Sequence, residues 1–148
     1  GAPRLVRCLP SGGQNVTNAV ASALYVSGPD AERIKREIGI EYAPPPEQAP
    51  AAEAITSVVR SLVEAIRNTF VYYAGNNPGA GIDVVVLSGG GSHLPGLGQY
   101  LSSASRLPVN LGDPVAPLRP GKLLNRQSLA GRESLLALPI GLAYGVAA

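Results

Sequence analysis

The sequence predicts an α/β fold, and three observations lead to that prediction. Apolar residues recur at i, i+3 and i+4 over residues 14–26 and 51–73, which is the pattern of amphipathic helices. Residues 82–87 form a nearly continuous apolar run between glycines, which is typical of a central strand covered on both faces. No segment repeats with a period of about 20 to 50 residues, so a solenoid is excluded.

The first third of the chain is predicted to hold the end of a strand and two helices. Residues 4–9 have the composition of a strand end, and a glycine turn then leads into the helix at 14–26. Ser27 is expected to cap a second helix over residues 31–38, and Gly39 is expected to end it. The apolar side of this helix would bury Ala31, Ile34 and Ile38.

The middle of the chain contains a proline-rich connection and the clearest helix. Residues 43–53 include four prolines, which lack an amide proton and clash inside helices, so an extended connection is predicted. The helix at 51–73 carries its apolar residues on one face and is expected to end in the glycine-rich stretch 74–81. That face comprises Ile55, Val58, Val59, Leu62, Val63, Ile66 and Phe70.

After the strand and its glycines, the pattern predicts a helix over residues 95–103 and a short extended piece at 108–111. A proline-rich loop to about residue 132 and a final helix complete the chain. The apolar run 135–148 is interrupted by Pro139 and is too short to cross a bilayer. We therefore expect a buried terminal helix there and no insertion into a membrane.

Composition excludes several functional classes. The 148 residues suit one domain, and 12 basic against 10 acidic residues leave a net charge of only +2. With six tyrosines and one phenylalanine as the only aromatics, no nucleic-acid partner is predicted. Cys8 is the only cysteine, which excludes an internal disulfide and a multi-cysteine metal site. The absence of methionine and the start at Gly1 indicate a piece of a longer polypeptide.

The segment Ser-Gly-Gly-Gly-Ser-His-Leu-Pro-Gly, residues 88–96, has the composition of a ligand loop. A strand, a glycine turn and a helix place free amides at the helix start, and the missing side chains let a ligand approach. The segment matches neither known phosphate fingerprint, because Leu97 and Gly98 replace the Lys-Ser/Thr pair of a P-loop and no small residue completes a dinucleotide motif. On this basis a ligand site and a simple tight turn are equally supported.

A second candidate is the charged face of the helix at 31–38. Glu32 lies within one turn of both Lys35 and Arg36, and a solvated face held by ion pairs is the simpler interpretation. His93 stands alone beside the glycines, without a Ser, Asp or second His at a suggestive spacing. No catalytic residues and no metal ligands are predicted.

Four segments together resemble the second lobe of actin-like ATPases, which have a ribonuclease H-like fold. They are LPSGGQNVTNAVASAL, GPDAERIKREIG, VVVLSGGGSHLPGLGQYLSSASRLPVNLGDP and LPIGLAYG, and they cover most of the chain. Within this superfamily the chain is most similar to the PilM proteins of type IV pilus assembly, because of the LSGGGS and LPSGGQNVT segments. FtsA-like cell-division proteins are the alternative, and a protein-interaction module without a ligand is a third hypothesis.

The resemblance implies an adenosine pocket. In this superfamily ATP lies between two lobes, and the adenosine loop of the second lobe is matched by Gly89, Gly90, Gly91, Ser92 and Leu94, with His93 placed to flank the adenine ring. A helix bearing Glu, Lys and Arg forms the other adenosine element. Its counterparts are Glu32, which would accept from ribose hydroxyls, and Lys35 and Arg36, which would line the pocket.

The resemblance also implies what this chain does not supply. The two phosphate loops of the superfamily would lie before Gly1, so ATP with Mg²⁺ is the expected cofactor of the intact protein only. The isolated chain is expected to bind ATP weakly or not at all and to hydrolyse none. The predicted division is a subdomain 2A, incomplete at its N-terminus, over residues 1–28 and 81–148, with a 2B insertion at 29–80.

Partners and location follow from the same resemblance. PilN-like inner-membrane pilus assembly proteins would bind through the missing lobe, and the protein would lie in the cytoplasm at the inner face of the membrane. A sheet without its first strands would leave an unpaired edge, through which we expect a dimer.

Overall fold

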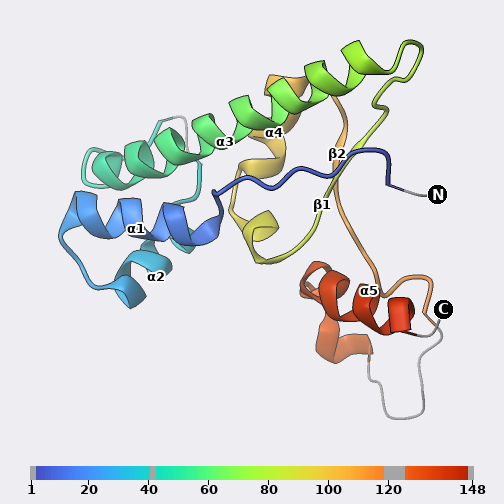
Figure 1. The fold of residues 1–148 in the computed structure, drawn as a ribbon. Coiled ribbons are helices and arrows are strands. Elements are labelled where there is room, and N and C mark those ends of the chain that lie inside the picture. Colours follow the sequence, from blue (N-terminus) through green and yellow to red (C-terminus); the bar gives the residue numbers. More distant parts are fainter. Residues whose placement is uncertain (1–2, 41–42, 119–125, 147–148) are drawn as a thin grey trace.

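The computed structural model describes residues 3–40, 43–118 and 126–146. Figure 1 shows the arrangement of the helices and of a small sheet. The elements are α1 (Gly13–Leu24), α2 (Gly28–Ile38), α3 (Ala49–Asn76), β1 (Val85–Leu87), η1 (Gly90–His93), α4 (Leu97–Ser105), β2 (Val109–Leu111), η2 (Arg126–Leu129), η3 (Glu133–Leu136) and α5 (Ala137–Val146), where η marks a 3₁₀ helix. No helix in the described part of the chain is long and apolar enough to cross a membrane. The prediction of a mixed α and β fold is confirmed.

The core lies where α1, α2 and α4 pack against α3. The long helix α3 runs alongside α1 and extends over α4 (Figure 1). Each apolar side chain that is fully buried here contributes about 1.5 to 3 kcal/mol to stability. The buried members of this cluster are Val16, Val20, Ala31, Ile40, Ala51, Ile55, Val59, Val63, Leu97 and Leu101.

The predicted capping residues flank α2, although the helix is longer at its start than predicted. The Ser27 hydroxyl accepts from the Asp30 amide at 3.3 Å, and Pro29 occupies the first turn, where its missing amide proton has no cost. The helix therefore begins at Gly28, three residues earlier than predicted. Gly39 ends it with φ +62°, a conformation that favours glycine.

Two predictions for the N-terminal half are wrong. Residues 4–9 form no strand in the described structure, whose sheet consists of β1 and β2, because a strand is defined by ladder hydrogen bonds that this segment does not make. The proline-rich connection ends sooner than predicted, since α3 begins at Ala49. Pro50 sits in the first turn of α3, where a proline is tolerated.

The sheet is smaller and more exposed than the sequence predicts. β1 pairs with β2 in parallel, with Val85 opposite Val109 and Leu87 opposite Leu111. A central strand covered on both faces is wrong for β1, because Val86 is 61% exposed and no second described strand pairs with β1. An apolar run shows a tendency to be buried, but what covers it depends on the rest of the fold.

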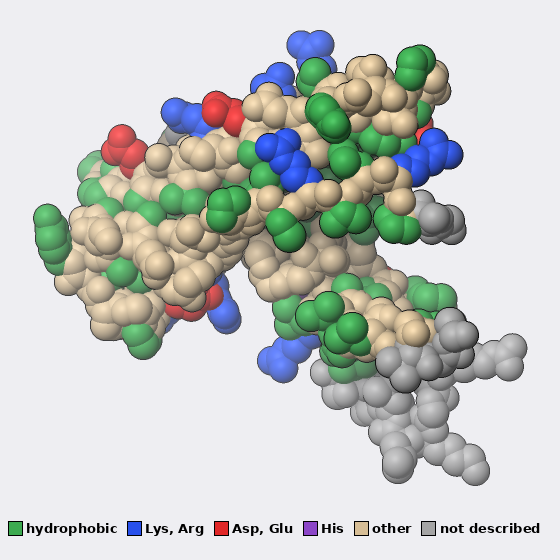
Figure 2. All heavy atoms as spheres, in the orientation of Figure 1, with side chains coloured by type: hydrophobic (Ala, Val, Ile, Leu, Met, Phe, Trp, Pro, Cys, Tyr) green, Lys and Arg blue, Asp and Glu red, His purple; other side chains and the backbone are tan. Residues whose placement is uncertain are grey.

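The terminal helix α5 forms as predicted, but the prediction that it is buried is wrong. It lies apart from the α1–α3 layer and contacts η3 (Figure 1). Leu138, Leu142 and Tyr144 are exposed, and hydrophobic side chains lie on the surface of this part of the molecule (Figure 2). The apolar composition was correctly associated with a helix, whereas burial also requires a facing surface.

Candidate functional site

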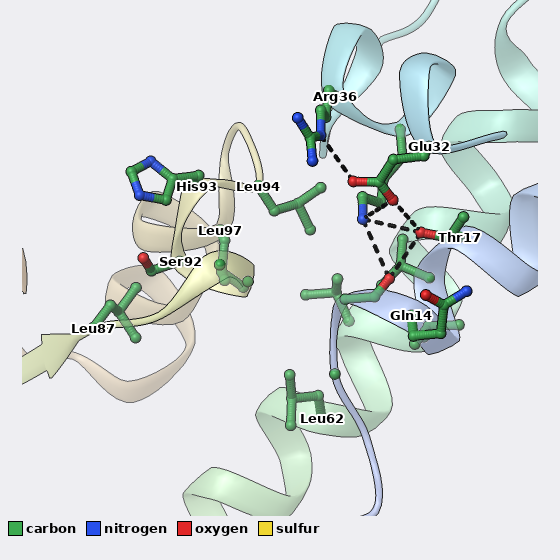
Figure 3. A pocket seen from close by; sticks show the side chains of 18 of the residues that line it. Gln14, Thr17, Glu32, Arg36, Leu62, Leu87, Ser92, His93, Leu94 and Leu97 are labelled. Atoms are coloured by element: carbon green, nitrogen blue, oxygen red, sulfur yellow. Dashed lines mark hydrogen bonds and ion pairs between the residues drawn. The ribbon is translucent and has the colours of Figure 1, made fainter. Parts of the chain in front are cut away.

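A cleft of about 930 Å³ lies between two walls of the molecule (Figure 3). One wall is made by the start of α1 and by α2. The other is made by the glycine loop with η1, and the segment before η3 borders it. The volume is within the range of small-molecule sites.

The polar wall is organised around the carboxylate of Glu32. Its Oε2 accepts from the Thr17 hydroxyl at 2.5 Å and from Lys35 Nζ at 2.6 Å, and its Oε1 accepts from Arg36 Nε at 2.8 Å. Lys35 is buried, and its ammonium also donates to Thr17 Oγ1 at 3.0 Å and to the Gly13 carbonyl at 3.3 Å. The three protons of the Lys35 ammonium are therefore all engaged.

These contacts hold the carboxylate in its ionised form. The pKa of Glu32 falls from its ordinary value of 4.5 to about 2. The hydrogen bond from Lys35 is the largest cause and the one from Thr17 is the second, while partial burial acts in the opposite direction. At neutral pH Glu32 therefore presents only acceptor oxygens.

The opposite wall is the glycine loop. The turn begins at Gly89, whose φ of +85° favours glycine, and its amide donates to the Ser134 carbonyl at 2.9 Å. The Ser92 hydroxyl is buried and donates to the Gly89 carbonyl at 2.6 Å. His93 Nε2 lies 2.7 Å from Ser134 Oγ. The segment containing η3 thus holds the glycine loop in place through Ser134.

A close backbone contact holds the two walls together. The Ile40 amide, just after α2, donates to the Pro95 carbonyl at 2.8 Å. Gly96 has φ +82°, and a Cβ there would lie 2.6 Å from the Ile40 carbonyl oxygen. A Cβ at Gly39 would likewise lie 2.5 Å from Pro95. Only glycines allow this approach, which fixes α2 against the loop.

Most of the predicted site residues line the cleft together. They are Glu32, Lys35, Arg36, Gly90, Gly91, Ser92, His93 and Leu94. Gly89 is not among the lining residues; it forms the turn directly before η1. The simpler interpretation, a solvated face held by ion pairs, is right about the ion pairs, since Glu32 pairs with Lys35 and Arg36. It is wrong about solvation at Lys35, which is buried.

Sequence reasoning missed a further part of the lining. Gly13, Gln14 and Thr17 from α1 line the polar wall, and Arg132 and Leu135 line the side nearest η3. The glycine pair before α1 was a usable signal, because a helix that starts in glycines exposes its first amides. Nothing in the sequence around Arg132 indicates that it lies beside the glycine loop.

The donor set suits an organic ligand better than a metal ion. No group of three or more His, Cys, Asp or Glu side chains in the described residues could hold a metal. The walls instead combine an ionised carboxylate, apolar side chains such as Leu94 and Leu97, and a glycine backbone. These groups offer an acceptor for hydroxyl donors and apolar surface for a flat ring.

Comparison with known proteins gives a family and a fold. The family model described as type IV pilus assembly protein PilM matches residues 5–145. A solved structure described as the PilM-PilN type IV pilus biogenesis complex contains a similar chain, with a TM-score of 0.77 and 24% identity. The match covers 96% of the present chain but only 39% of that chain, so the present chain spans well under half of its length. A comparison with curated proteins returns no match.

Proposed function

The chain belongs to the family of the type IV pilus assembly protein PilM, and on that premise we propose that it supplies the adenosine pocket of an ATP-binding, actin-like protein of pilus assembly. The observation that carries the proposal is the convergence of Glu32 and the glycine loop on one cleft. An ionised carboxylate opposite a bare glycine backbone offers a hydroxyl acceptor on one side and room for a flat ring on the other.

Each residue of the cleft has a proposed role. Glu32 accepts from the ribose hydroxyls, and the aliphatic stem of Arg36 covers the base. The backbone of Gly90 and Gly91, followed by Ser92, lies against the nucleoside, while Gly89 forms the turn that leads into them. His93 flanks the adenine ring, and Leu94 adds an apolar contact. Lys35 lines the polar wall, where it contacts Glu32 and Gly13.

The remaining parts of ATP recognition are proposed to lie outside this chain. ATP would bring Mg²⁺, and both would be held by phosphate loops on other residues of the longer protein, within a fold divided as 1–28 with 81–148 and an insertion at 29–80. Without those loops the chain hydrolyses no ATP. Turnover of ATP by the pure 148-residue chain in the presence of Mg²⁺ would contradict this.

The proposed setting is the cytoplasmic face of the inner membrane. The similar solved chain comes from a PilM-PilN complex, which supports a PilN-like partner for the whole protein. We propose that this partner binds through parts of the protein beyond this chain. In the absence of that partner, the open edge of the β1–β2 sheet would pair between two copies. Sedimentation that detects only monomers up to high concentration would contradict such pairing.

Nuclear magnetic resonance titration of the longer protein, labelled with ¹⁵N, tests the pocket with adenosine, because the 148-residue chain by itself is expected to bind nucleotide weakly or not at all. The amides of Glu32, Gly90, Gly91 and Ser92 should shift in one saturable process. Gly91→Ala should weaken binding, because a Cβ at Gly91 points toward the Gly13 amide on the other wall, at 4.0 Å, without a clash. Gly75→Ala is the matched control, since Gly75 lies in α3 with open space around it.

The same titration separates the pocket from the hypothesis of a pure interaction module. Absence of shifts at millimolar adenosine, or shifts that Gly91→Ala leaves unchanged, would refute the adenosine pocket. The FtsA-like alternative has lost its support, because the matching family model is that of PilM.

A further inference from the structure

The hydroxyl of Thr17 is one polar group of the cleft to which the proposed function gives no role. Thr17 is 3% exposed and lies one helical turn after Gly13 in α1. Its single proton has two acceptors within reach, Glu32 Oε2 at 2.5 Å and the Gly13 carbonyl at 3.0 Å. The charged and nearer oxygen of Glu32 is the stronger acceptor, so the proton goes to Glu32.

The contacts of the two Glu32 oxygens are unequal. Each carboxylate oxygen has about two acceptor positions. Oε2 uses both, for Thr17 and Lys35, whereas Oε1 uses one, for Arg36. Figure 3 shows Thr17 on one side of the carboxylate and Arg36 on the other, toward the glycine wall. One acceptor position therefore remains, and it is on Oε1.

We propose that Thr17 is a positioning residue of the nucleoside site: together with Lys35 it holds Oε2 of Glu32, so that Oε1 is the oxygen that accepts from a ribose hydroxyl. This inference rests on the proposed function and deepens it, because it gives the contact between Thr17 of α1 and Glu32 of α2 a role in ligand binding. Without the Thr17 hydroxyl the carboxylate can rotate, and either oxygen can turn toward Lys35.

The contribution of Thr17 to the environment of the Glu32 carboxylate can be tested separately from the two ion pairs. In the described part of the chain, the charged groups in contact with Glu32 are Lys35 and Arg36, both on its own helix, and α1 contributes the Thr17 hydroxyl. The Thr17 hydrogen bond is the second largest cause of the lowered Glu32 pKa. Removing that hydroxyl, which also accepts from Lys35 Nζ, should therefore raise the pKa of Glu32, while Lys35 and Arg36 still pair with the carboxylate through either oxygen.

The test compares Thr17→Val, which has nearly the same shape without a hydroxyl, with Thr17→Ser, which retains the hydroxyl. Each substitution is made in the longer protein, and two probes, adenosine and 2′,3′-dideoxyadenosine, are titrated into each variant. The unmodified protein should bind adenosine about tenfold more tightly than the dideoxy compound, which is the size of one hydrogen bond to a charged group. Thr17→Val should reduce this ratio to about one without changing the affinity for dideoxyadenosine, and Thr17→Ser should retain it.

A second measurement requires no ligand. The ¹³C resonance of the Glu32 carboxyl, followed from neutral pH downward, should titrate at a higher pH in Thr17→Val than in Thr17→Ser or the unmodified chain. If Thr17→Val fails to fold, Thr17→Ala removes the same hydroxyl with less bulk.

The outcomes separate the two proposals. An adenosine to dideoxyadenosine ratio that Thr17→Val leaves unchanged, or an unchanged Glu32 pKa, overturns the positioning role while the pocket stands. Failure of the unmodified longer protein to bind adenosine overturns the pocket itself, and the role of Thr17 in it. A merely structural Thr17 would weaken both nucleosides equally, which also counts against the proposal.

Discussion

The close contact between Gly96 and Ile40 gives the sharpest prediction, because one added methyl group tests how the two walls are joined. In Gly96→Ala the new Cβ would lie 2.6 Å from the Ile40 carbonyl oxygen and 3.1 Å from Ile40 Cβ. The first atom belongs to the backbone and the second is bonded directly to it, so neither can move aside as the end of a flexible side chain would. The loop must shift away from the end of α2.

Three costs add in this variant. A non-glycine residue at φ +82° costs about 1 kcal/mol. Loss of the hydrogen bond from the Ile40 amide to the Pro95 carbonyl costs about another 1 kcal/mol, and partial exposure of the buried Ile40 side chain costs a similar amount. The free energy of unfolding should therefore fall by about 3 kcal/mol.

Gly79→Ala is the matched control. Gly79 has nearly the same φ, +81°, but open space around it, so only the backbone cost of about 1 kcal/mol applies. Urea denaturation of both variants should give a difference of about 2 kcal/mol. If the two variants lose the same stability, the contact between Gly96 and Ile40 does not hold the walls together.

Three further predictions concern Glu32, Ser134 and α5. Because the folded chain lowers the Glu32 pKa from 4.5 to about 2, the stabilisation is complete above pH 4.5 and is lost as the pH falls toward 2. Because the Glu32 side chain is one-third exposed, solvent screening reduces this stabilisation to about 1 to 2 kcal/mol. Glu32→Gln should therefore unfold at a lower urea concentration at pH 7, but its free energy of unfolding should fall less on acidification than that of the unmodified chain. Equal acid sensitivity of the two chains would contradict this prediction. Ser134→Ala removes the partner of His93 Nε2 and should speed hydrogen exchange of the loop amides from Ser92 to Leu94, whereas unchanged exchange would show that the contact does not restrain the loop. Leu142→Lys on α5 should change the free energy of unfolding by less than about 0.5 kcal/mol, because Leu142 is 63% exposed. Ile55→Ala in the core should cost about 3 kcal/mol by comparison. A large loss of stability in Leu142→Lys would mean that α5 is buried against another surface.

Features encoded by neighbouring residues could be predicted from the sequence. The helices followed from apolar spacing, and the ends of α2 followed from Ser27 and Gly39, because a cap acts within one turn of its own helix. The predictions for β1 and α5 depended on distant surfaces, and both failed. The segments that form β1 and α5 are both apolar, but their own residues do not determine whether another part of the protein covers them.

The candidate site shows the same division. The sequence by itself determined the composition of each wall: the glycines at 89–91, and Glu32 within one turn of Lys35 and Arg36. Only the tertiary structure brought these walls together, through the contact of Ile40 with Pro95 and the contact of Thr17 with Glu32. The physical reason is range: helix and turn preferences act over a few residues, whereas a cleft is formed by contacts between segments that only the packing of the whole chain brings into reach.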